Sequence, residues 1–181
     1  IKLGEKILII GAGGGVNSMA IQLAKLAGCE VFAITSGNDK VQHARSLGAD
    51  VAICRLADEN WPKTLFKITD KKGFDVVVDN VGQATLNQSL KLVKNGGRIV
   101  IVGNTSGPMF NLDIRYLFAK QISLIGSTMG SHKDFLDVMQ LVFNGKIHPV
   151  IHEVFPFEKA KEAMKLLENG QQFGKIVLSQ S

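Results

Sequence analysis

Short apolar runs alternate with amphipathic stretches along most of the chain. Lys6–Ile10 (KILII) has the pattern of a buried strand, residues 16–27 repeat apolar side chains at helical spacing, and Gly28 then provides a stop. The same alternation predicts further strands at 30–35, 49–53, 74–79, 98–102 and 121–126 and further helices at 39–47, 61–69, 84–93, 113–118 and 135–143.

Val and Ile dominate the predicted strands. Nearly continuous apolar strands separated by helices are typical of a parallel sheet covered on both faces. We therefore predict an α/β fold over residues 1–146, a doubly wound six-stranded parallel sheet of the Rossmann type. Residues 147–181 show an extended run, an amphipathic helix and a final strand, which predicts a C-terminal strand–helix–strand extension.

Composition narrows the class of protein. The 181 residues are 45% hydrophobic and 20% charged, which suits one globular domain with a real core. The net charge is +5, but the basic residues are scattered without an aromatic stripe, so we expect no nucleic-acid partner. Without a membrane-length apolar run or a signal-peptide pattern, we expect a cytoplasmic protein with reduced Cys29 and Cys54. A first residue that is not Met suggests a processed chain or a fragment of a longer one.

A glycine-rich run lies between the first predicted strand and the first predicted helix. Glycines let the backbone approach a ligand, and the helix that follows directs N–H groups and the positive end of its dipole at an anion. The expected pyrophosphate-binding residues are Gly11, Gly13, Gly14, Gly15 and Val16. The run departs from the usual fingerprint at Asn17, where a glycine normally permits close helix–strand packing, so we expect a slightly shifted helix.

The end of the second predicted strand favours NADP over NAD. NAD-binding domains usually place Asp or Glu there, to bond the ribose 2′-hydroxyl. Here Thr35, Ser36 and Lys40 offer hydroxyls and a cation, which suit a 2′-phosphate. Asp39 argues the other way, although a helix N-terminus also favours an acid at that position, and Lys40 as an ordinary surface residue remains an alternative.

Ligands of open α/β sheets bind beyond the carboxyl ends of the strands. That rule selects the residues after the fourth, fifth and sixth predicted strands. They are Asn80, Val81, Val102, Gly103, Gly126 and Ser127.

Several motifs together resemble the medium-chain dehydrogenase/reductase superfamily, in its zinc-type alcohol dehydrogenase and quinone oxidoreductase branches. The matching segments are GGV at 14–16 with QLAK at 22–25, Lys40 with LGAD at 47–50, GFDVVVD at 73–79, GGR at 96–98, IGS at 125–127, and FPF at 155–157 with GKIVL at 174–178.

The resemblance implies hydride transfer between NADP(H), or less favourably NAD(H), and an alcohol, carbonyl or quinone-like substrate. The tips of strands four to six would line the nicotinamide half, and Arg55 would lie near the adenine unless it is simply exposed. In this superfamily a separate N-terminal domain carries the catalytic centre and any zinc, and residues 147–181 would pack on it. We therefore assign no catalytic residue and no metal ligand to this chain, whose four histidines lack zinc-site spacing.

The resemblance also implies a homodimer formed through the apolar edge strand from Ile122 to Ile125. Two other functions are compatible with a glycine-rich first turn. One is a non-catalytic dinucleotide-binding module or sensor. The other is an S-adenosylmethionine methyltransferase, which the missing acid after the second strand disfavours.

Overall fold

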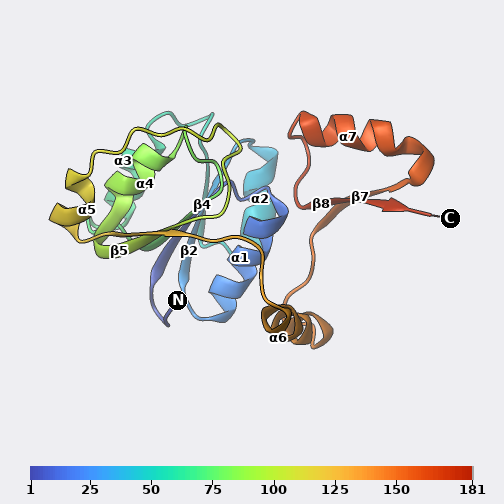
Figure 1. Cartoon of the computed structure of the whole chain (residues 1–181), viewed down its shortest axis with the longest axis horizontal. Helices are drawn as coiled ribbons and strands as arrows, with labels where there is room; N and C mark the ends of the chain where they lie inside the picture. Colours follow the sequence, from blue (N-terminus) through green and yellow to red (C-terminus); the bar gives the residue numbers. More distant parts are fainter. Residues whose placement is uncertain (181) are drawn as a thin grey trace.

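Strand β1 (Lys6–Ile10) lies inside a six-stranded parallel sheet with the order β3-β2-β1-β4-β5-β6. The computed structural model describes residues 1–180. The other strands are β2 (Glu30–Thr35), β3 (Val51–Cys54), β4 (Phe74–Asp79), β5 (Val93–Ile101) and β6 (Ser123–Gly126). The chain moves outward from β1 to β3 and then returns to place β4 on the other side of β1 (Figure 1). This is the predicted doubly wound arrangement, and it is confirmed.

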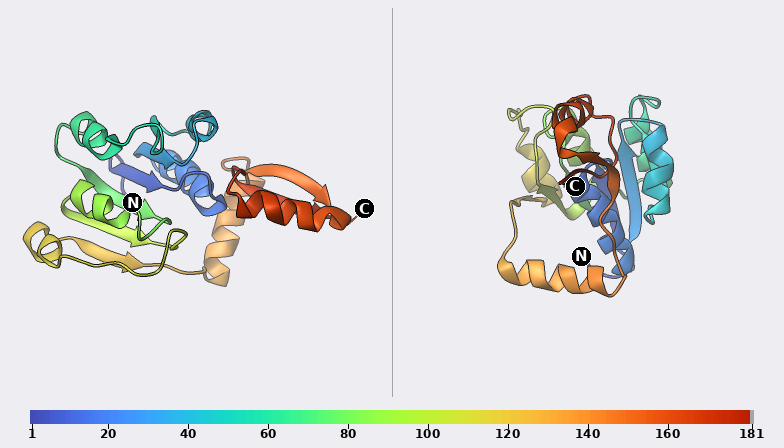
Figure 2. Two further views of the ribbon diagram at one scale, coloured as in Figure 1. Left: turned by 90° about the horizontal axis from the view of Figure 1, so that it is seen from above. Right: turned by 90° about the vertical axis from the view of Figure 1, so that its right-hand side faces the viewer.

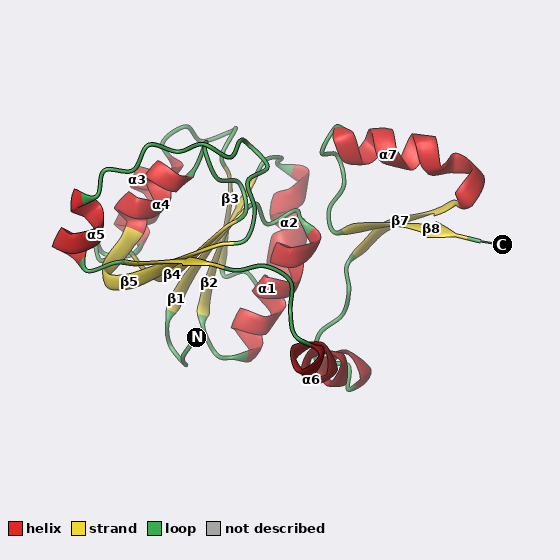
Figure 3. Ribbon diagram, in the orientation of Figure 1, coloured by secondary structure: helices red, strands yellow, loops and turns green. Residues whose placement is uncertain are grey.

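Helices cover both faces of this sheet. Successive side chains of a strand point to opposite faces, so Ile7 and Ile9 pack with α1 (Gly15–Leu26) and α2 (Asp39–Ser46). Leu8 and Ile10 face the opposite way and share a core with α3 (Trp61–Ile68) and α4 (Leu86–Leu92), beside which α5 (Arg115–Lys120) also packs. Figure 3 shows the strands between these two groups of helices.

The remainder of the chain leaves the sheet. It comprises α6 (His132–Phe143), β7 (Ile151–Pro156), the 3-10 turn η1 (Phe157–Lys159), α7 (Ala160–Glu168) and β8 (Lys175–Ser179). Strands β7 and β8 pair in parallel as a separate two-stranded sheet, which projects to one side with α7 lying along it (Figure 2). The predicted strand–helix–strand extension is therefore present.

Backbone hydrogen bonds attach this extension to the glycine-rich turn. The Gly174 amide donates to the Gly13 carbonyl at 2.8 Å, and Phe173 is buried with its ring centroid 5.1 Å from that of His43. Farther along, Gln22 exchanges two 2.9 Å hydrogen bonds with the backbone of His148. The extension is thus hydrogen-bonded to the turn before α1 and to α1 itself.

The largest departure from the predicted elements lies between α4 and β5. We expected a helix to residue 93, a turn at 95–97 and a strand from 98, but α4 ends at Leu92 and β5 begins directly at Val93. Val93 pairs with Phe74, and pairing resumes with Arg98 opposite Val76. The intervening residues form a bulge around Gly96 at φ +70°. In the sequence, Asn95 and the two glycines after it resemble a turn between a helix and a strand, which is why the prediction was wrong here.

Two glycines beside β4 and β5 provide a test of this packing. Gly73 has φ +79° and a Cβ there would overlap the Leu92 carbonyl, whereas Gly96 has no atom within 4 Å of such a Cβ. We expect Gly96→Ala to lower the free energy of unfolding by about 1–2 kcal/mol through its left-handed backbone alone. Gly73→Ala adds an overpacking penalty of about 1–3 kcal/mol. Urea unfolding of both variants measures the difference, and equal losses would contradict it.

Candidate functional site

A cleft of about 570 Å³ opens at the carboxyl ends of β1, β2 and β4, where the strand order of the sheet reverses. This switch point is where open α/β sheets bind ligands. Ten of the predicted site residues line the cleft. They are Gly11, Gly13, Gly14, Gly15, Val16, Thr35, Ser36, Lys40, Asn80 and Val81.

Four predicted residues do not line it, namely Val102, Gly103, Gly126 and Ser127. Gly103 lies beside the residue that follows β4, because a Cβ on it would meet the Asn80 carbonyl oxygen at 3.1 Å. Gly126 lies on β6, the exposed outer strand of the sheet. The structure thus gathers the predicted residues at the ends of β1, β2 and β4 around one cleft and leaves those predicted directly after β5 and at the end of β6 outside its walls.

The turn between β1 and α1 is built by its own backbone. Gly11 is left-handed at φ +88°, and the amides of Gly11 and Ala12 both donate to the Ile34 carbonyl at 3.0 Å. No side chain caps the first turn of α1, which begins at Gly15. Helix N–H groups without an intrahelical partner and the positive end of the helix dipole therefore stand at the cleft wall, as an anion site requires.

Asn17 fastens this turn. Its side chain is fully buried, and Nδ2 donates to the carbonyl of Ile10 at 2.8 Å and to that of Gly11 at 3.2 Å. The residue that interrupts the glycine fingerprint thus joins the strand, the turn and the helix through one amide. Asn17 could be recognised from the sequence as an exception to the glycine fingerprint, but these two hydrogen bonds could not be predicted from it.

Lys175 is a cleft residue that the sequence analysis missed. Its side chain lies across Gly15, with Nζ 3.1 Å from the position a Cβ on Gly15 would take. The bond from the Lys175 amide to the Val150 carbonyl, at 2.8 Å, fixes its backbone. A cation from the C-terminal extension thereby stands at the N-terminus of α1, and a large side chain at Gly15 would displace it.

Lys40 lies in the first turn of α2, beyond the tip of β2, with only 6% of its surface exposed. Its Nζ donates to the Gly170 carbonyl, and its aliphatic stem lies against Gly13. Ser36 is exposed beside it and Arg55 also lines the cleft. Lys40, Arg55 and Lys175 face a single acid, Glu168, among the cleft residues of the described chain. The cleft therefore favours an anionic ligand.

Asp79 holds the tip of β4 in place. This fully buried carboxylate accepts hydrogen bonds from the amides of Val81 and Gly82, at 2.9 and 3.0 Å, and from the hydroxyls of Thr85 and Ser89, at 2.9 and 2.7 Å. The loop that carries Asn80 and Val81 to the cleft is thereby fixed. The buried Oδ1 of Asn80 has no protein partner, which leaves an acceptor for a ligand.

Further cleft residues also escaped the sequence analysis. They are Ile34, Thr105, Ser106, Leu167, Glu168, Gly170 and Gln172. Thr105 and Ser106 lie a few residues after β5. Leu167, Glu168, Gly170 and Gln172 belong to the C-terminal extension. Only tertiary contacts such as the hydrogen bond from the Ser106 hydroxyl to the Val81 carbonyl, at 2.6 Å, bring them here.

Two negative observations apply to residues 1–180. No three histidine, cysteine or acidic side chains group closely enough there to hold a metal ion. None of the described helices combines the length and the apolar character needed to cross a membrane.

The sequence and the fold are similar to those of known dehydrogenases and reductases. Residues 15–144 match the zinc-binding dehydrogenase family. The chain is 34% identical over 98% of its length to an acryloyl-coenzyme A reductase of Sulfurisphaera tokodaii, and 33% identical over 96% to an NAD-dependent alcohol dehydrogenase of Saccharolobus solfataricus. It covers 52% and 50% of those proteins, so it spans about half the length of the curated relatives it matches.

Solved structures agree. An NAD-dependent alcohol dehydrogenase superimposes with a TM-score of 0.93 at 39% identity, over 100% of this chain and 52% of its own. A 2-octenoyl-CoA carboxylase reductase, solved with NADP and 2-octenoyl-CoA, gives a TM-score of 0.91 at 27% identity, over 99% of this chain and 44% of its own. The resemblance to medium-chain dehydrogenases/reductases is confirmed, and the chain belongs to the zinc-binding dehydrogenase family.

Proposed function

We propose that the cleft binds NADP(H) and that the whole protein is an oxidoreductase acting on an alcohol, carbonyl or quinone-like substrate. The observation that carries the proposal is the charge of the cleft, three cations against one acid, around an uncapped helix N-terminus. A dinucleotide with a 2′-phosphate is the most anionic member of its class and suits such a wall.

The residues present fit this group along the cleft. Gly15 and Val16 would hold the pyrophosphate with their amides, assisted by Lys175. Ser36 and Lys40 would meet the 2′-phosphate, with Lys40 exchanging the Gly170 carbonyl for it, because both are acceptors for the same ammonium. These contacts orient the bound group. The Asp39 carboxylate, in the first turn of α2, lies against Gly37 just beyond the β2 tip, so Lys40 must offset its repulsion of the 2′-phosphate.

The nicotinamide half would lie toward β4. Asn80 and Val81 line that end, and the unpartnered Oδ1 of Asn80 can accept from a carboxamide. Val102, Gly103, Gly126 and Ser127 stay predicted contacts for this half, reached by a ligand that extends beyond the cleft walls. When bound, the nicotinamide ring supplies the hydride chemistry; this chain binds and orients it.

The relatives differ in cofactor and substrate. The S. solfataricus protein is NAD-dependent and the carboxylase reductase was solved with NADP, so the preference of this chain rests on its own cleft. Their names include an alcohol dehydrogenase and an acryloyl-coenzyme A reductase. The choice between such substrates, and any zinc, belongs in our proposal to a catalytic domain outside these residues.

The C-terminal extension has a surface suited to such a domain. Ile151, Val154, Phe157 and Met164 are each more than half exposed on β7, η1 and α7. Large apolar side chains exposed together are typical of a surface that packs on another domain. We propose that residues 147–181 pack on the catalytic domain with this apolar face while Lys175 still reaches the cleft.

Lysine variants test the cofactor proposal. Lys175→Met removes a cation from the pyrophosphate end, so affinity for NADPH and NADH should both fall about 10- to 100-fold. Lys40→Met should weaken NADPH more than NADH. Fluorescence titration with both nucleotides measures the affinities, and Lys165→Met on exposed α7 is the control. Tighter binding of NADH would contradict the 2′-phosphate assignment, and binding of S-adenosylmethionine alone would contradict the ligand class.

Asn17 gives a second test. Asn17→Ala leaves the Ile10 and Gly11 carbonyls without their side-chain donor, so the free energy of unfolding should fall by about 1–3 kcal/mol. NADPH affinity, measured where the variant is folded, should fall as well because the turn loses its fixed geometry. Asn87→Ala on the exposed face of α4 is the matched control and should change neither quantity. Unchanged NADPH binding in a destabilised Asn17→Ala would limit its role to stability.

The edge of the sheet leads to a third test. Strand β6 is exposed throughout, with Leu124 39% and Ile125 41% accessible, and such an apolar edge favours pairing with a second copy. We therefore propose a homodimer through the 122–125 strand. Light scattering should give twice the 19.6 kDa of one chain, and Ile125→Glu should halve it, while Met164→Glu on α7 should not. A monomeric unmodified chain would refute this interface.

A further inference from the structure

A second groove lies on the opposite side of the molecule from the C-terminal extension, between α3 and α4. It encloses about 410 Å³ and shares no lining residue with the cofactor cleft. Its floor is apolar and includes Leu92 and Phe66, whose ring remains 37% exposed. An exposed aromatic at the bottom of a hollow provides a place for an apolar group of another molecule.

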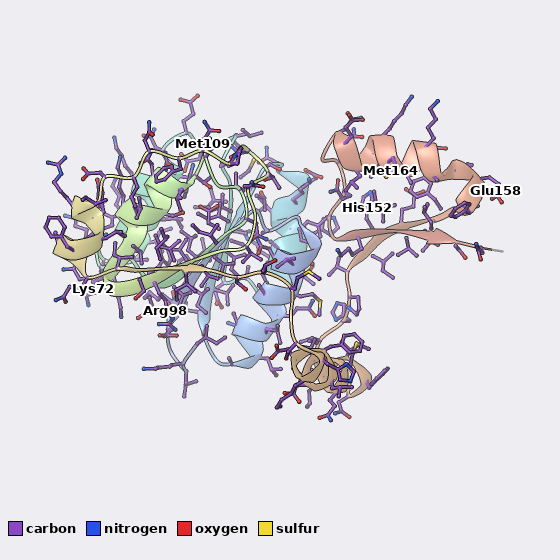
Figure 4. All side chains as sticks on the ribbon, in the orientation of Figure 1. Lys72, Arg98, Met109, His152, Glu158 and Met164 are labelled. Atoms are coloured by element: carbon purple, nitrogen blue, oxygen red, sulfur yellow. The ribbon has the colours of Figure 1, made fainter. Side chains whose placement is uncertain are left out.

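Four lysines surround this floor: Lys63, Lys67, Lys71 and Lys91. We call the floor and its four lysines the lysine groove. The lysines come from α3, the loop after it and α4, so they are scattered in the sequence and gathered only by the fold. None of the four forms an ion pair within residues 1–180. The groove is far from the C-terminal extension: Lys72, in the same loop as Lys71, lies at the opposite end of the molecule from Met164 and Glu158 of the extension (Figure 4).

The loop that carries Lys71 has a constrained backbone. Asp70 and Lys71 are both left-handed, at φ +52° and +62°, a conformation unfavourable for residues with a Cβ. The buried Thr69 hydroxyl holds the loop by donating to the Leu65 carbonyl at 3.1 Å and accepting from the Gly73 amide at 3.2 Å. Lys71 therefore extends from a fixed position at the rim of the groove.

The spacing of these cations defines what they can meet. Lys63 and Lys67 form a row one helical turn apart, about 6 Å along the axis, and Lys71 lines the same groove from the loop beyond the helix end. A single carboxylate cannot reach all of them. Acidic side chains one turn apart on a second helix have the same spacing and would pair with the row, while an apolar side chain between them reaches Phe66.

We propose that the lysine groove is a docking site for an acidic amphipathic helix of a partner protein. A single-stranded nucleic acid is held by successive aromatic platforms along a basic track, whereas this groove offers one ring, that of Phe66. A lipid surface would be held by several exposed apolar side chains, whereas among the lining residues of the groove Phe66 is the one large apolar residue that is exposed. The charge and the shape of the groove both match a helix with alternating carboxylate and apolar positions.

A synthetic helical peptide of about 15 residues, with glutamates one turn apart flanking leucines, is the probe. Fluorescence anisotropy at about 50 mM salt should show saturable binding that weakens several-fold at about 500 mM. Spectra of the ¹⁵N-labelled protein should shift at α3, the 69–73 loop and α4. A peptide of the same composition in shuffled order should bind at least about tenfold more weakly, because it cannot present both features on one face.

Two variants separate the groove from general charge. Lys63→Gln with Lys67→Gln should weaken peptide binding about tenfold or more, and Phe66→Ser should weaken it at unchanged charge. Lys161→Gln with Lys165→Gln on α7 is the matched control, with the same spacing, exposure and change in charge, and should leave binding unchanged. Thermal unfolding checks that each variant is folded, and NADPH titration checks that the cofactor cleft is unaffected.

The proposal is overturned if the peptide does not bind by about 1 mM, if the shuffled peptide binds equally, or if the groove variants bind like the control. It is also overturned if single-stranded RNA or phosphatidylserine vesicles bind through the same lysines more tightly than the peptide.

Discussion

The close approach of backbone to backbone at the β1–α1 turn is the constraint on which the cleft depends. Two amides of the turn share the Ile34 carbonyl, and the Gly13 carbonyl accepts from Gly174 across the chain. Gly11 takes the left-handed conformation that this turn requires, and the buried side chain of Asn17 in α1 bonds the turn's backbone. The helix N-terminus, the strand tips and the C-terminal extension are all positioned relative to this turn.

The buried centre of the sheet could be predicted well from the sequence. Strands 30–35 and 74–79 are observed with the predicted bounds, because each is an apolar run between clear stop signals. The bulge in β5 could not be predicted, since its position depends on pairing between Val93 and Phe74 rather than on local pattern. Local signals therefore identified strands, and partner strands decided where pairing began.

The same division applies to the cleft. Gly15 could be found because it belongs to a glycine-rich run between a strand and a helix, and Thr35 and Asn80 because they lie at or directly after the end of a predicted strand, where the switch-point rule selects them. Lys175 and Asp79 could not. Lys175 reaches Gly15 from the far end of the chain, and Asp79 acts through four hydrogen bonds that a sequence does not display. Cleft residues at strand ends can therefore be predicted from the sequence, whereas residues that reach the cleft from distant parts of the chain cannot.

Lys175 also changes the mechanical status of the C-terminal extension. A ligand that touches both the α1 N-terminus and this lysine would be in contact with the sheet domain and with the extension at once, and so would act as a reversible crosslink between them. By thermodynamic linkage, whatever immobilises the extension strengthens ligand binding, and the ligand in turn immobilises the extension. The mobility of the C-terminal extension and the occupancy of the cleft by its ligand would therefore change together.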